Sequence, residues 1–542
     1  MQLSLLAPLL CLLPANALVI PDAASVLSQL SLSTEKSVQI PFLLLWFSST
    51  DKSEKEEANF EKWLASQKNQ SFHYILQNIG GILTVLDTKE VAPGVVIASP
   101  LKNHPNYFYN WIRDSALTIR SLISQLEDDP SGDSDYLKKV IEDYILVNYH
   151  LQRLPNKSGK FDDNTRSGLG EPKFMADGTT FDEHWGRPQS DGPGLRVVTI
   201  TDYLDLLEKR NEVVHSDFLG NRTFIYREIV KPDLEYVLAN WNIEAFDLWE
   251  EIDALHFFNS LTMMRALSEG RRLAEAEDET AEFINRLDET FKNLKSFITD
   301  PRTGFAPSTL PFIVETPKLK QQGRRGGLDA ATLLAALHSH EVDGRDTNTI
   351  PFDVDDHRIL NTLLYMVSDM KYRYPVNHDN IRIEQNIGVG LGRYPEDVYD
   401  GYGTSEGNPW FISTASAAEV VLRMIYKTLE KKSDLVISSN NREFFSVFMK
   451  DLFENQMPDG NIVLPYGSQR YKLLMYGLYD YSDTFLKVIM NHVDSNNGRM
   501  SEQFNKFDGY MQGAEDLTWS YLSFYNCARW RLKVYGLILN MA

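Results

Sequence analysis

The chain has 542 residues, of which 43% are hydrophobic and 11% aromatic, so it can bury at least one large core. Its formal net charge is −21 and its isoelectric point is about 5. Because so acidic a surface repels phosphate backbones and anionic lipids, we expect neither nucleic acid nor a membrane surface as a partner. A neutral substrate is compatible with this charge, although the charge selects none.

The N-terminus predicts a secretory signal peptide over residues 1–17. An apolar run from Leu3 to Leu13 precedes the small-x-small pattern at 15–17, and the run is too short to span a bilayer. The alternative is a buried N-terminal segment. We therefore expect a secreted protein, located outside the cell, at the cell wall or in the vacuole.

Cysteines and sequons fit a secreted product. Cys11 would leave with the signal peptide, so Cys527 would remain alone and no internal disulfide is expected. Three Asn-x-Ser/Thr sequons make Asn69, Asn156 and Asn221 candidate glycosylation sites.

Helical periodicity dominates the rest of the chain. The apolar spacing predicts helices, in order, over 54–67, 117–123, 136–145, 203–207, 330–337, 359–366, 415–426, 444–453 and 473–490, and another that holds Trp519. The short apolar stretch 40–47 is either a strand or a packing arm. No alternation with a period of two competes over comparable length, so the sequence predicts an all-α toroid of antiparallel helices. Long Gly-, Pro- and Asp-rich loops, such as 154–194 and 391–410, are expected to carry function.

Segment 247–253 (DLWEEID) places four acids within seven residues, one of them beside Trp249. A carboxyl group next to an indole loses solvent, which favours its protonated form, as a general acid requires. The alternative is a helix entrance whose acids suit the helix dipole. Taken alone, the segment fits the second explanation at least as well.

Two further segments have the same ambiguity. Segment 501–504 (SEQF) is followed by 514–519 (AEDLTW). Taken alone, this pattern predicts a loop that contains the acid Glu502 and then a capped helix. In segment 106–114 (NYFYNWIRD), aromatic residues stand next to an Arg–Asp pair. This combination suits the apolar faces and paired hydroxyl groups of sugars. The alternative is an aromatic core cluster with a capping Asp. Loops 185–193 (WGRPQSDGP), 392–397 (GRYPED) and 407–411 (GNPWF) add more arginines, acids and aromatic residues. Each alone could be a turn and a helix cap.

Together and in this order, these segments resemble the loops of the glucoamylase family, glycoside hydrolase family 15, and especially its yeast branch. The resemblance runs from about residue 76 to the C-terminus and includes YNWIRDSAL, WGRPQSDGPGLR, DLWEEIDALHFF, GRYPEDVYDGYG, GNPWF, SEQF and AEDLTWSY. It implies an (α/α)6 barrel with the active site in loops at one end. It also implies a glucan 1,4-α-glucosidase that releases β-glucose from the non-reducing ends of starch, dextrin or glycogen by inverting hydrolysis.

By position in these motifs, Glu250 resembles the general acid of the family and Glu502 its general base. Arg113 and Asp114 resemble the pair that grips the terminal glucose, and Glu251 the residue that binds the sugar on the leaving-group side. The remaining substrate-binding residues implied by the resemblance are Tyr107, Trp185, Leu248, Trp249, Arg393, Trp410 and Trp519. The sequence as a whole thus predicts a signal peptide at 1–17, an N-terminal arm at 18–75 packed on the barrel and, from the resemblance, a catalytic domain at 76–542. We expect the protein to act as a monomer.

The chain departs from the family pattern where Ile252-Asp253-Ala254 replaces the usual Asn-Gly after the glutamate pair, which leaves the pH optimum open. We see no starch-binding module, so soluble glucans are expected as substrates. Rival interpretations are a trehalase or α-1,6-glucosidase on the same barrel, and an inactive sugar-binding protein. We expect no metal and no cofactor, and the pair His338 and His340 is expected at the surface.

Overall fold

The computed structural model describes residues 51–81, 90–128, 134–340, 350–382, 387–449 and 460–541. The predicted signal peptide and the 40–47 stretch lie outside the described residues. The chain divides into two compact units, residues 1–66 and 67–542. The boundary predicted between residues 75 and 76 falls inside helix α4 (Asp51–Gln77), which begins in the first unit and ends in the second, and the domain assignment itself stays a prediction.

Helices dominate the second unit. After α4 they are α5 (Ile112–Asp128), α6 (Ser134–Arg153), α7 (Asp191–Arg210), α8 (Arg222–Ile225), α9 (Lys231–Asn240), α10 (Phe257–Ala276), α11 (Ala281–Thr299), α12 (Pro317–Gln321), α13 (Ala330–Ser339), α14 (His357–Arg373), α15 (Phe411–Glu430), α16 (Arg442–Ser446), α18 (Gln469–His492) and α19 (Thr518–Met541). Short 3-10 helices η2 (Ser167–Gly170), η4 (Pro301–Thr303) and η5 (Pro375–Arg382) and one π-helical turn, η3 (Tyr226–Val230), lie between them.

Strands are short and occur in antiparallel pairs. In the described part of the chain, β1 (Tyr109–Trp111) pairs with β2 (Lys173–Met175), β3 (Ala245–Phe246) with β4 (Asp253–Ala254), β5 (Leu435–Ile437) with β6 (Ile462–Leu464), and β7 (Gln503–Phe504) with β8 (Met511–Gln512). These four two-stranded sheets build no layer of their own.

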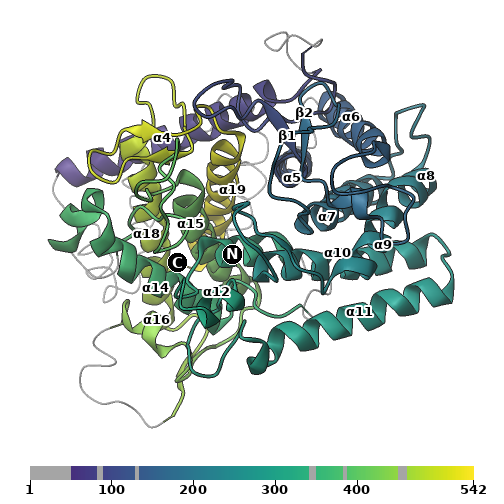
Figure 1. Cartoon of the computed structure of the whole chain (residues 1–542). Helices are drawn as coiled ribbons and strands as arrows, with labels where there is room; N and C mark the ends of the chain where they lie inside the picture. Colours follow the sequence, from purple (N-terminus) through teal and green to yellow (C-terminus); the bar gives the residue numbers. More distant parts are fainter. Residues whose placement is uncertain are drawn as a thin grey trace. The chain divides into compact units, whose positions relative to one another are not determined.

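Among the described residues, six helices form a closed inner ring. Helix α5 packs on α7, α7 on α10, α10 on α13, α13 on α15, α15 on α19, and α19 on α5 again. Figure 1 labels α5, α7, α10, α15 and α19 of this ring. Five of them carry an outer partner: α6, α9, α11, α14 and α18 pack on α5, α7, α10, α13 and α15, respectively. The end of α4 supplies the sixth, since the ring of Tyr74 lies 4.9 Å from that of Tyr521 on α19. The domain is therefore an (α/α)6 barrel, and the predicted fold class is confirmed.

The inner and outer helices differ in the way their sequences pack. The inner helix α15 is buried on nearly all sides, with small residues such as Ala415 and Ala418 allowing close approach of its neighbours. The outer helix α11 buries a single stripe that includes Phe283, Leu287 and Leu294. A helix that is covered on every side needs no polar face, whereas a helix on the outside of a barrel keeps one.

The structure differs from the predicted helices at several places. Helices α10 and α11 were not predicted, and α7 begins at Asp191 although only its later part, 203–207, showed a clear pattern. The helix expected over 444–453 is present only as α16 (Arg442–Ser446) within the described residues. None of the described helices is long and apolar enough to cross a membrane.

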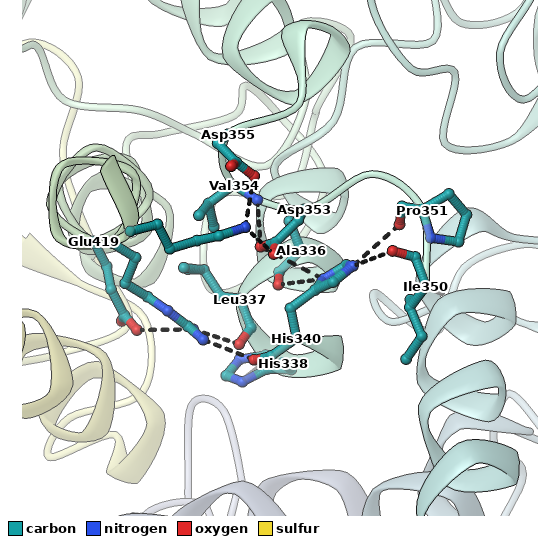
Figure 2. Close-up of polar contacts among 12 residues, drawn as sticks. Ala336, Leu337, His338, His340, Ile350, Pro351, Asp353, Val354, Asp355 and Glu419 are labelled. Carbon is teal, nitrogen blue, oxygen red and sulfur yellow. Dashed lines mark hydrogen bonds and ion pairs between the residues drawn. The ribbon is translucent and has the colours of Figure 1, made fainter. Parts of the chain in front are cut away.

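The prediction that His338 and His340 lie at the surface is wrong for His340, while His338 is half-buried. His340 is fully buried, with Nδ1 3.0 Å from the Ala336 carbonyl oxygen and Nε2 3.1 Å from that of Pro351 (Figure 2). Arg423 donates to the His340 carbonyl at 2.8 Å and also to that of Leu337. The last carbonyls of a helix have no partner within it, so a buried helix end needs such donors. His340 therefore belongs to the internal packing at the end of α13.

Candidate active site

A cavity of about 230 Å³ opens where the inner helices begin. Trp111 immediately precedes α5, Trp410 precedes α15, and Trp519 lies in the first turn of α19. All twelve residues singled out from the sequence line this one cavity: Tyr107, Arg113, Asp114, Trp185, Leu248, Trp249, Glu250, Glu251, Arg393, Trp410, Glu502 and Trp519. Closure of the helix ring thus brings together residues that are far apart along the chain.

Glu250 lies in the tight turn between β3 and β4, which we call the acid loop (residues 247–252). The acids were expected either as a catalytic site or as a helix entrance, and the structure excludes the helix entrance, because α10 begins only at Phe257. Asp247 Oδ1 closes the loop by accepting from the backbone N–H groups of Glu251 at 2.7 Å and Ile252 at 2.8 Å. Glu250 itself has a φ of 66°, a left-handed conformation that is unfavourable for a side chain and typical of functional turns.

Three donors surround a single oxygen of the Glu250 carboxyl group. Trp111 Nε1 donates to Oε1 at 2.7 Å and Gln189 Nε2 donates to it at 2.9 Å, while Arg113 Nη2 lies 3.6 Å away. Because Oε1 accepts from these groups, a proton on this carboxyl is held on Oε2. The loop and its donors therefore fix both the position of the group and the oxygen that carries its proton.

Arg113 and Asp114 form the first turn of α5 and are both buried. Arg113 Nη1 donates to Gln189 Oε1 at 2.9 Å and to Asp191 Oδ2 at 3.0 Å, and its Nε lies 3.6 Å from Asp114. Burial raises the pKa of Asp114 to about 7, against the opposing charge of Arg113, and the nearby Glu250 raises it further. The pair offers a donor and an acceptor side by side, a match for adjacent sugar hydroxyl groups.

Glu502 enters the cavity from the turn that leads into β7. Its backbone N–H donates to Ala514 at 2.9 Å, and its carboxylate accepts from Gln503 Nε2 at 3.2 Å and from the hydroxyl groups of Tyr107 and Tyr399. Burial raises the pKa of Glu502 to about 8, although Arg393 and the two tyrosines oppose the shift. Once ionised, such a carboxylate is a strong base.

Gly513 makes room for the Glu502 carboxylate. It has a φ of 78°, and a Cβ atom there would collide with Glu502 Oε2. Only glycine combines this backbone conformation with such a close approach.

Glu251 and Arg393 form a second charged group on the open side of the cavity. Arg393 Nη2 donates to Glu251 Oε1 at 2.8 Å, and Arg325 Nη2 donates to its Oε2 at 2.7 Å, where Tyr394 also donates. Burial would raise the pKa of Glu251, but Arg393, Tyr394 and Arg325 outweigh it and the pKa is lowered. Asp397 holds Arg393 from behind, with Oδ2 accepting from Nε at 2.8 Å. Glu251 is thus a permanent acceptor in a rigid frame.

Several residues of the site were not singled out from the sequence. Tyr399 and Gln189 lie inside motifs that were recognised, so those motifs already contained the signal. Lys173, whose ammonium group lies among aromatic rings behind the acid loop, had no such signal, because its neighbours come from distant segments. Asp253, which departs from the family pattern, is exposed on β4 and does not line the cavity.

In chemical terms, the carboxyl groups of Glu250 and Glu502 line the cavity together with Glu251, an Arg–Asp pair and several indole rings. Two such carboxyl groups are what hydrolysis of a glycosidic bond requires, one to protonate the leaving oxygen and one to act on the opposite face of the sugar. Aromatic rings provide flat apolar surface for the sugar ring.

Comparison with known proteins agrees with this chemistry. The family described as glycosyl hydrolases family 15 matches residues 71–529. The chain is 39% identical over 492 residues to a glucoamylase of Saccharomycopsis fibuligera, covering 89% of this chain and 92% of that protein. It is 37% identical over 486 residues to the intracellular sporulation-specific glucoamylase of Saccharomyces cerevisiae, covering 88% and 85% of the two chains.

Solved structures give the same result. The structure of the Saccharomycopsis fibuligera glucoamylase superposes with a TM-score of 0.83 at 38% identity, covering 88% of this chain and 96% of that one. The family 15 glucoamylase of Hypocrea jecorina superposes with a TM-score of 0.75 at 29% identity, covering 88% and 73%.

Proposed function

Because this chain belongs to glycosyl hydrolases family 15 and has glucoamylase activity on α-glucans, we propose that it removes β-glucose from the non-reducing ends of α-1,4-linked chains by inverting hydrolysis. The observation that carries this proposal is the placement of Glu250 and Glu502 in one cavity with the buried Arg113–Asp114 pair. In the proposed mechanism Glu250 is the general acid and Glu502 the general base.

The contacts of Glu250 suit it to protonate the glycosidic oxygen. When the carboxyl group carries the proton that a general acid gives up, Oε2 is the oxygen that holds it, because Trp111 and Gln189 donate to Oε1. As the proton leaves, negative charge develops on the carboxyl group, and the donors at Oε1 are already in place to stabilise it. Donors that are fixed before the reaction contribute to the rate without reorganising.

Glu502 is suited to activate water. In its ionised form it accepts a proton from a water molecule that attacks the anomeric carbon on the face opposite the leaving group. This single displacement requires roughly 6.5–9.5 Å between the two carboxyl groups and inverts the anomeric configuration. The hydroxyl groups of Tyr107 and Tyr399, 2.9 Å apart, flank the carboxylate and hold it in place.

The buried Arg113–Asp114 pair at the start of α5 supports hydrolysis from the end of the glucan chain. Arg113 and Asp114 would bind hydroxyl groups of the terminal glucose, and the guanidinium of Arg113 lies 5.7 Å from the ring of Trp519. Glu251, held by Arg393 and Arg325, would accept a hydrogen bond from the sugar on the leaving-group side. A site closed at one end by a charged pair accepts a chain end and excludes the middle of a chain.

We further propose that the protein is secreted, N-glycosylated and monomeric. The signal-like N-terminus supports secretion, although one relative is described as intracellular. Asn221 and Asn69 are exposed, which supports them as glycan sites. Asn156 is the weakest of the three, because its Nδ2 already donates to the Gly168 carbonyl at 2.8 Å.

Product analysis on maltoheptaose tests the central proposal. We expect glucose as the first product, released as the β anomer when fresh product is followed by NMR, and a loss of about 10²- to 10⁴-fold in kcat for Glu502→Gln with maltose binding retained. Release of α-glucose, or of longer fragments from within the chain, would overturn the mechanism. Near-normal turnover by Glu502→Gln would remove that residue from its role.

A further inference from the structure

Lys173 occupies an unusual position behind the acid loop. It lies on β2 directly opposite Trp111 on β1, and only 1% of its surface is exposed. Its Nζ atom lies 3.4 Å from the ring centre of Trp185, 4.1 Å from that of Tyr109, 4.2 Å from that of Phe181 and 4.5 Å from that of Trp111. In the part of the chain that the structure describes, the side chain of Lys173 makes these ring contacts and no ion pair within 4.0 Å. We call this arrangement the Lys173 cage.

The cage connects directly to the proposed acid. Trp111 belongs to the cage and also donates the 2.7 Å hydrogen bond to Glu250 Oε1. Trp185 belongs to the cage and also lines the cavity. The rings hold one another as well, since the ring centres of Trp111 and Trp185 are 5.9 Å apart and those of Phe181 and Trp185 are 6.0 Å apart. The ammonium group of Lys173 therefore contacts the same indole that donates to the proposed acid.

We propose that Lys173 is a positioning residue for the hydrolysis: its ammonium group fixes the Trp111 and Trp185 rings and, through Trp111, the carboxyl group of Glu250. This inference rests on the proposed function, because it takes Glu250 as the general acid. The attraction of an ammonium group for aromatic faces is strongest where water is excluded, as it is here. Because Lys173 is buried beneath the rings, it acts through them and does not touch the sugar.

The charge of Lys173 makes this role dependent on pH. Burial lowers the pKa of Lys173 to about 7, Glu250 opposes this shift, and Arg187 adds to it. Arg187 is itself paired with the carboxylate of Glu171 at 3.0 Å, while β1 and Phe181 present only rings to the ammonium group. Lys173 is thus charged below about pH 7 and loses its charge, and with it the attraction to the rings, as the pH rises through that value.

The test compares wild type with Lys173→Met, which keeps the length of the side chain and removes its charge. We expect kcat on maltose at pH 5 to fall about tenfold to a hundredfold with KM little changed, and the ratio of wild type to variant to shrink as the pH rises above about 7. A purely structural role predicts a ratio that does not vary with pH. The matched control is Lys231→Met, which removes a lysine 4.9 Å from the Phe283 ring, away from the cavity, and should leave kcat unchanged.

A second variant keeps the proposal testable if Lys173→Met does not fold. Phe181→Leu removes one ring of the cage that does not line the cavity, so a severalfold loss of kcat at pH 5 that shrinks above about pH 7 supports the proposal. Wild-type kcat in either variant, or a loss that is constant with pH, overturns it. Release of β-glucose by the wild type tests the proposed function separately, so the two failures are distinguishable.

Discussion

Replacing Trp111 by phenylalanine tests whether the donor at Glu250 Oε1 acts in catalysis. The substitution removes the 2.7 Å hydrogen bond from Nε1 and keeps an aromatic ring against Tyr107, whose centre lies 5.6 Å away. The bond strengthens in the transition state, because charge develops on the carboxyl group as it gives up its proton.

The size of the effect follows from the nature of the bond. A hydrogen bond to a charged group contributes about 1.5–3 kcal/mol. If all of it acts in the transition state, kcat falls by about 10- to 150-fold, since each 1.36 kcal/mol is a factor of ten. Gln189 still donates to the same oxygen at 2.9 Å, so we expect a loss near the lower end of this range.

The assay is steady-state glucose release from maltose and maltoheptaose, giving kcat and KM separately. Trp185→Phe serves as a comparison, because Trp185 Nε1 is buried without a hydrogen-bond partner among the described residues and its loss should affect KM more than kcat. Trp241→Phe, which alters an indole packed on Phe297 outside the cavity, should leave both constants unchanged. If Trp111→Phe retains kcat within twofold, the indole N–H does not stabilise the developing charge and the reasoning fails.

Three further outcomes are expected. Tyr399→Phe removes a hydrogen bond that lowers the pKa of Glu502, so the pKa of Glu502 should rise. Because Glu502 acts when ionised, the acid limb of the kcat/KM profile should move to higher pH. An acid limb that stays in place or moves to lower pH would contradict this. Gly513→Ala should lower kcat more than tenfold in maltose assays, because the added Cβ would displace the Glu502 carboxylate. An unaltered kcat would show that the backbone at residue 513 moves aside without displacing that carboxylate. Arg196→Met leaves Asp233 buried without the guanidinium that donates to it at 2.7 Å. Urea unfolding should therefore show that the free energy of unfolding falls by about 3–5 kcal/mol. A decrease below about 1 kcal/mol would mean that the ion pair is not needed for stability.

Much of the fold could be predicted from local patterns. The outer helices α6, α14 and α18 were predicted because each has one face towards the core, which leaves a period of 3.6 in the sequence. Helix α10 was missed because it is buried all round and contains polar residues such as Asn259 and Arg265 inside the barrel. Helix α11 has a clear apolar stripe, so its periodicity is sufficient to predict it.

The family, the all-α barrel and the twelve cavity residues could be predicted from the amino-acid sequence, because ordered motifs and helical periodicity are properties of neighbouring residues. How those residues are held follows from the tertiary structure alone. The donors that meet Glu250 Oε1, the raised pKa of Glu502 and the burial of His340 depend on groups from distant segments that come together when the ring of helices closes. Lys173 is the clearest case: it looks like any lysine on a short strand until Tyr109, Phe181 and Trp185 surround it. Burial and electrostatic contacts across such distances leave no periodic trace in the chain, so no local pattern could have revealed them.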